Sequence, residues 1–133
     1  MTQQPVPAGT GVDAEVARPG GVSYLHIPAR DIAQSAEFYR ATFGWRLTGD
    51  PQAPGFSDGT GHVIGHWHTG APAPRETGVV PYIYVTSIDG TLRTASGRGA
   101  EIVTPPRPEG NLWVATIRDP AGNVIGVWQA GPR

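Results

Sequence analysis

Four histidines are the side chains of this sequence best suited to acid–base or metal chemistry: His26, His62, His66 and His68. A neutral imidazole near physiological pH can act as a general base or bind a divalent metal. His66 and His68 form an H-x-H pair, which binds a metal when a third ligand is supplied. The sequence contains no cysteine, which excludes a thiolate metal site, a cysteine nucleophile and a disulfide framework.

Aromatic side chains with polar tips alternate along four strand-like runs of the sequence. Alternate residues of a strand point to opposite faces of its sheet. One parity suits packing against helices and comprises Leu25, Ile27, Ile64, Ile83, Val85, Ile125 and Val127. The other parity comprises Tyr24, His26, Gly65, Trp67, Tyr82, Tyr84, Gly126 and Trp128. We expect this second face to line an accessible cup, because so many polar-tipped rings would need hydrogen-bond partners if they were buried.

His26 is the catalytic candidate that this parity favours, because it is the imidazole on the cup face. A role as a hydrogen-bonded wall residue beside tyrosines stays open. The same parity places His66 and His68 with Ile64 on the helix side, and His62 lies at a turn. We therefore expect these three histidines to be surface or packing residues.

The predicted ligand-binding residues are Tyr24, His26, Trp67, Tyr82, Tyr84, Trp113 and Trp128. Glu109, in the expected loop 105–111, could fold over the cup together with Trp113, although loops of this composition are normally exposed connections. No charged group is clearly placed to bind a phosphate or a carboxylate. The sequence therefore favours an aromatic, promiscuous pocket over a strongly charged one.

An internal repeat organises the chain into two similar halves. Residues 56–70 and 117–131 match at Asp58/Asp119, Gly61/Gly122, Val63/Val124, Ile64/Ile125, Gly65/Gly126, Trp67/Trp128 and Gly70/Gly131. A similar offset pairs Asp31 with Asp89, each between a strand-like and a helix-like run. Each half therefore repeats one plan of elements.

That plan is a strand, a helix and three further strands. In the first half Asp31, with Gln34 three residues later, predicts a helix start, and Gly44 predicts its end. The expected strands are 22–28, 45–48, a short run near Phe56 and 62–68, then 80–86, 101–104, 112–118 and 123–129, with a second helix around Ile88, Leu92 and Ala95. The fold class is α+β: two βαβββ modules, about 21–70 and 78–131, form a cupped mixed β-sheet in a domain spanning 20–133 after a flexible tail, 1–19.

Length and charge narrow the functional classes. A chain of 133 residues suits one domain, and its net charge of −1 argues against nucleic-acid or membrane-surface partners. No run approaches the roughly 20 apolar residues of a membrane-spanning helix. Residues 1–19 lack a basic start followed by an apolar run, so we expect no signal peptide and a cytoplasmic location.

Two groups of motifs are Asp31, Phe38-Tyr39 and Phe43-Gly44-Trp45 after the first strand, and Asp119-Pro120-Ala121-Gly122-Asn123 before the last. With these motifs the sequence resembles the vicinal oxygen chelate superfamily, which includes glyoxalase I, bleomycin-resistance proteins, fosfomycin-resistance transferases and extradiol dioxygenases. The resemblance runs from Gly21 to the C-terminus and implies this cupped fold and a homodimer. Enzymes of the superfamily commonly hold a divalent metal through His, Gln or Glu.

The positions that match those metal ligands here are Tyr24, Gly65, Val80 and Gly126, and none is a usual ligand. We therefore expect no metal or other cofactor. Three functions stay open: a metal-independent protein that binds a small planar or aromatic molecule, an interaction module with a filled cup, and an enzyme. The enzyme would be of lyase, isomerase or dioxygenase type, with His26 as base and Tyr82 or Tyr84 as proton donor, or with a divalent metal on displaced ligands.

Overall fold

The computed structural model describes residues 13–19, 22–70 and 80–133. Most of the tail expected over 1–19 lies outside the described residues, as does 71–79. The elements are β1 (Tyr24–Pro28), α1 (Ile32–Phe43), β2 (Arg46–Thr48), β3 (Gly55–Ser57), β4 (Ile64–His68), β5 (Tyr82–Tyr84), α2 (Ile88–Gly97), β6 (Glu101–Glu109), β7 (Leu112–Arg118) and β8 (Val124–Ala130).

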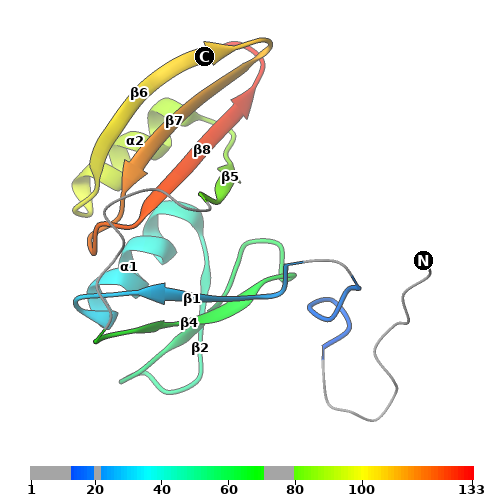
Figure 1. Ribbon diagram of the computed structural model, residues 1–133, viewed down its shortest axis with the longest axis vertical. Helices are drawn as coiled ribbons and strands as arrows, with labels where there is room; N and C mark the ends of the chain where they lie inside the picture. The colour runs from blue at the N-terminus through cyan, green and yellow to red at the C-terminus, as the bar shows by residue number, and fades with distance from the viewer. Residues whose placement is uncertain (1–12, 20–21, 71–79) are drawn as a thin grey trace.

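These elements form two four-stranded mixed sheets, with the orders β1-β4-β3-β2 (sheet 1) and β5-β8-β7-β6 (sheet 2). β1 runs parallel to its neighbour β4, and β5 runs parallel to its neighbour β8. The other neighbouring strands are antiparallel. Figure 1 shows the two sheets as separate bodies of strands with the helices beside them. The predicted α+β class and the two βαβββ modules are confirmed.

Local signals in the sequence explain the bounds of α1. The Asp31 carboxylate accepts a hydrogen bond from the backbone N–H of Gln34 at 3.1 Å, which satisfies a free donor in the first turn. Gly44 ends the helix at a φ of 72°, a left-handed conformation that a Cβ would strain. Both predicted boundaries are confirmed.

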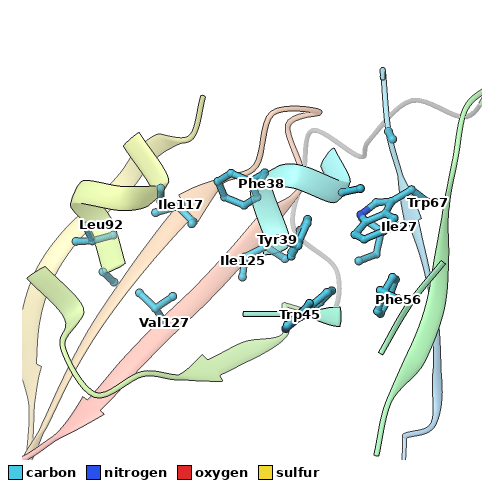
Figure 2. Packing of buried hydrophobic residues seen from close by; sticks show 14 of the residues in the cluster. Ile27, Phe38, Tyr39, Trp45, Phe56, Trp67, Leu92, Ile117, Ile125 and Val127 are labelled. Atoms are coloured by element: carbon cyan, nitrogen blue, oxygen red, sulfur yellow. The ribbon is translucent and has the colours of Figure 1, made fainter. Parts of the chain in front are cut away.

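The helices and the facing sides of both sheets share one hydrophobic core. In Figure 2, Phe38 and Tyr39 of α1 lie between Ile117, Ile125 and Val127 of sheet 2 and Ile27, Phe56 and Trp67 of sheet 1. The helices contact each other, and each packs mainly on the sheet of its own module. The other face of each sheet, called here its outer face, therefore points away from this core, so the two outer faces lie on opposite sides of the chain.

Two of the family-like motifs meet in a polar link between the modules. The buried Tyr39 hydroxyl donates to Asp119 Oδ2 at 2.9 Å. Asp119 Oδ1 accepts from the backbone N–H groups of Ala121 and Asn123, and Asn123 Nδ2 donates to the Pro28 carbonyl at 2.8 Å. Burial, followed by the charge of Asp119, raises the pKa of Tyr39 well above its usual value, so this hydroxyl stays a donor.

The segment 105–111 was expected to be a loop, and the structure corrects this. β6 continues to Glu109, which pairs with Leu112 across the hairpin. The strand tolerates Pro105, Pro106 and Pro108 because β6 is the last strand of its sheet and pairs with β7 alone, with register shifts along its length. Glu109 is therefore part of a hairpin and not of a loop that folds over a cup.

Candidate ligand-binding faces

The outer face of sheet 2 carries the aromatic group that the sequence predicted. Tyr82 pairs with Gly126 and Tyr84 with Trp128, so all four residues share one face. Tyr82 is 49% exposed and Tyr84 is 55% exposed. The rings of Tyr84 and Trp128 meet edge to face, with their centroids 4.8 Å apart. Three aromatic side chains thus form an accessible surface on this sheet.

Gly126 is what allows Tyr82 to lie against the sheet. A Cβ built on Gly126 would come within 2.3 Å of a Tyr82 ring carbon, far inside van der Waals contact. The Tyr82 ring therefore covers the glycine backbone and lies in the same row as Thr116 and Thr104. The two threonine hydroxyls bond each other at 2.7 Å, so this row is uncharged, whereas the neighbouring row of Tyr84 and Trp128 continues through Val114 to Arg107.

The outer face of sheet 1 is richer in imidazole than the sequence predicted. Tyr24 pairs with Ile64 and His26 with His66 in parallel register, so the side chains of each pair share a face. His68, two residues beyond His66, lies on this face too. The structure therefore corrects the face assigned to β4: His66 and His68 point outward with Tyr24 and His26.

A one-residue difference in register between the modules explains this correction. Tyr82 pairs with Gly126, but its counterpart Tyr24 pairs with Ile64 and not with Gly65, the repeat equivalent of Gly126. A shift of one residue transfers every side chain of a strand to the opposite face. The sequence repeat therefore aligns Gly65 with Gly126 although the two residues face different sides of their sheets.

Trp67 and Trp113 do not lie on the outer faces. Trp67 is 3% exposed and packs in the core against Phe56, with ring centroids 4.8 Å apart. Trp113 pairs with Gln129 on the helix side of sheet 2, where the Arg133 guanidinium lies 5.1 Å from its ring centroid. The predicted residues that the structure brings to the outer faces are Tyr24, His26, Tyr82, Tyr84 and Trp128.

The rings on sheet 1 are close neighbours. The Tyr24 hydroxyl and His66 Nδ1 are 2.5 Å apart, within hydrogen-bond distance. The His26 ring lies 5.1 Å from Tyr24 and 5.5 Å from His68, both edge to face. The H-x-H motif is visible in the sequence. The prediction placed His66 and His68 on the helix side of β4, so it missed that they lie beside His26.

The metal tetrad of the resembled superfamily does not fit this structure. Among the four matching positions, Gly65 and Gly126 have no side-chain donor, and Val80 is apolar. The space that a side chain would need is filled by the Phe56 ring at Gly65 and by the Tyr82 ring at Gly126. Within the described ranges, no group of three His, Asp or Glu side chains is arranged to hold a metal ion.

The two modules, each with one helix and four strands, give the chain a twofold βαβββ architecture. The chain belongs to the Glyoxalase/Bleomycin resistance protein/Dioxygenase superfamily, whose model matches residues 21–127. In the described part of the chain, neither helix is long and apolar enough to cross a membrane.

Curated relatives include anthracycline biosynthesis protein DnrV of Streptomyces peucetius, which is 30% identical over 132 residues. The match covers 85% of this chain and 48% of that protein, so the chain spans about half the length of the curated relatives it matches. Anthracycline biosynthesis protein DauV of Streptomyces sp. (strain C5) is 29% identical with the same coverage.

Solved structures show the same fold at low sequence identity. A glyoxalase/bleomycin resistance protein/dioxygenase family enzyme from Burkholderia phytofirmans PsJN has a TM-score of 0.68 at 19% identity, covering 81% of this chain and 97% of that one. The fosfomycin resistance protein FosX from Listeria monocytogenes has a TM-score of 0.69 at 16% identity, covering 83% and 93%.

Proposed function

We propose that this chain binds a planar aromatic small molecule on the outer face of sheet 2. The observation that carries the proposal is the exposure of Tyr82 and Tyr84, each about half accessible, on one face with Trp128. Large aromatic side chains gathered on an accessible surface are typical of binding sites. Their rings would stack on the ligand, and their hydroxyl and indole groups would orient it.

We propose that a second copy of the chain completes the site. One chain presents its two outer faces on opposite sides of its core, so a single ligand cannot touch both (Figure 2). In the described sheets, β1 and β5 are outermost strands, each paired on one side only. A twofold homodimer that places sheet 1 of one chain opposite sheet 2 of the other would create two equivalent cups.

We propose that binding does not use the superfamily's metal tetrad, because the matching positions lack donors and ring side chains fill the space at two of them. An enzyme remains the second candidate, favoured by the gathering of His26, His66 and His68 on one exposed face. There His26 would act as a general base toward a ligand held by the partner's aromatic face, or a divalent metal would bind on displaced ligands.

The chain's charge and composition also support its proposed surroundings. A net charge of −1 favours neither nucleic acid nor anionic membrane as a partner. The absence of cysteine fits a protein that folds without an oxidising compartment. We therefore propose that it acts in the cytoplasm on a small-molecule ligand.

A titration with planar aromatic compounds tests the binding proposal. Because the curated relatives are named for anthracycline biosynthesis, an anthracycline is the first probe, followed by simpler fused-ring compounds. We expect Trp128→Ala and Tyr84→Ala each to weaken binding by about tenfold, roughly 1.4 kcal/mol of stacking and contact. Trp113→Phe, on the helix side, is the matched control and leaves the affinity unchanged. Equal affinities for all four proteins would contradict the proposal.

Mixing two defective variants tests the shared cup. One variant carries Tyr24→Ala and His26→Ala, and the other carries Tyr84→Ala and Trp128→Ala. A dimer containing one chain of each has one cup with both faces intact, so we expect binding to return after subunit exchange at up to one site per mixed dimer. No recovery in demonstrably mixed dimers would show that the cup is not shared.

A further inference from the structure

The outer face of sheet 1 combines hydrogen-bonding rings with an absence of acidic groups. Tyr24 and His26 come from β1, and His66 and His68 come from β4. None of the four strands of this sheet, as the structure describes them, contains an aspartate or a glutamate. The face therefore presents several donors and no carboxylate that would neutralise or occupy them.

The remaining strands of sheet 1 reinforce this charge pattern. On β3 the outward positions are Gly55 and Ser57, which pair with His66 and Ile64. On β2 the outward residue beside Ser57 is Arg46, an exposed cation. The titratable and charged groups that face the imidazoles from the strands of this sheet are thus Tyr24 and Arg46. Neither brings a carboxylate to this face.

The geometry of His66 leaves one of its nitrogens free for a ligand. When the Tyr24 hydroxyl donates to His66 Nδ1, the imidazole carries its proton on Nε2. That Nε2 lies over Gly55, where a Cβ would come within 2.8 Å of it. The glycine therefore lets the ring lie low on the sheet, with its second nitrogen over β3 and its Nδ1 toward Tyr24 of β1.

Resting on the proposed function, we propose that this face binds an ionised oxygen of the aromatic ligand, a carboxylate or an acidic phenolate, through His26, His66 and His68. An imidazole has a reference pKa of about 6.5, so a bound anion draws a proton onto it and gains a charge-assisted hydrogen bond. The stacking face of sheet 2 would hold the ring system while the imidazole face of the partner holds its acidic edge.

A matched pair of probes separates these two contributions. We would measure the affinity of 2-naphthoate and of its neutral methyl ester at pH 6 and pH 8, both with and without a chelator. The carboxylate stays ionised at both pH values, so the change with pH reports on the protein. We expect the carboxylate to bind about tenfold more tightly than the ester at pH 6, and the preference to be smaller at pH 8, because a neutral imidazole holds an anion less tightly than a protonated one does.

Histidine variants assign the effect to this face. His26→Asn, His66→Asn and His68→Asn should each reduce the affinity for the carboxylate at pH 6 by a larger factor than the affinity for the ester, so that the carboxylate preference falls. His62→Asn is the matched control, because the Nδ1 of His62 contacts the Glu15 carbonyl oxygen, away from these rings. It should keep the full preference, and loss of the preference in this control would overturn the assignment to the imidazole face.

The other outcomes are equally decisive. Equal affinity for both probes at both pH values would overturn the inference while leaving the aromatic-binding function intact. A carboxylate preference that exists only without chelator would overturn it in favour of a bound metal. If neither these probes nor the anthracycline bind at all, the proposed function fails and the inference fails with it.

Discussion

The hydrogen bond between Tyr39 and Asp119 connects the two modules, and its removal tests how they are held together. Tyr39 is 0% exposed and Asp119 is 3% exposed, and their oxygens are 2.9 Å apart. Tyr39→Phe removes only the hydroxyl and leaves a buried carboxylate with one partner fewer. A hydrogen bond to a charged group contributes about 1.5–3 kcal/mol, so we expect the free energy of unfolding to fall by about this amount.

Urea or thermal unfolding followed by circular dichroism measures this loss. For a domain of this size the expected change is a decrease in Tm on the order of 5–10 °C. Tyr84→Phe is the control, because Tyr84 is 55% exposed, and its stability should change by less than about 0.5 kcal/mol. If Tyr39→Phe is no more destabilising than this control, the proposed role of the Asp119 turn in joining the modules is refuted.

The raised pKa of Tyr39 adds a pH dependence with a definite sign. Burial and the charge of Asp119 keep Tyr39 protonated in the folded state above the pH at which an unfolded tyrosine ionises, about 10. The folded state therefore binds more protons there, so the contribution of Tyr39 to stability is constant below about pH 10 and falls as the pH rises further. This part of the alkaline loss of stability should be absent from Tyr39→Phe.

Two further predictions test the faces of the strands. Trp67→Ala removes a buried ring and should lower the free energy of unfolding by about 3–5 kcal/mol. Trp128→Ala, on an outer face, should lower it by less than half as much in the same urea titration. Equal losses for the two variants would refute the register of β4. Gly126→Ala should displace the Tyr82 ring and weaken binding of a planar probe with a small loss of stability, and unchanged binding would show that this ring position does not matter.

Local signals made most of the fold predictable. The Asp31 cap, the Gly44 end and the repeated apolar runs each act within a few residues, and the structure has the expected helices and strands in the expected order. The end of β6 could not be predicted in this way. Its prolines indicate a loop when read locally, and their placement on an outermost strand is a property of the assembled sheet.

The site was only half predictable, because the face of a strand depends on pairing with a distant strand. The alternation rule placed Tyr82, Tyr84 and Trp128 correctly. In the first module the repeat indicated the wrong face for β4, since Tyr24 pairs with Ile64 and not Gly65. A difference of one residue in register is invisible in the sequence pattern, yet it decides whether Trp67 or the two histidines lie on the outer face.

The most direct test of ligand binding to the outer faces is the set of tryptophan indole N–H signals in an NMR spectrum, assigned with single Trp→Phe variants. Trp45 and Trp67 are buried in the core, Trp113 lies on the helix side of sheet 2, and Trp128 lies on its outer face. On addition of a planar aromatic probe, we predict a large shift of the Trp128 signal and little change in the other three. A shift of the Trp67 or Trp113 signal with Trp128 unmoved would contradict the account.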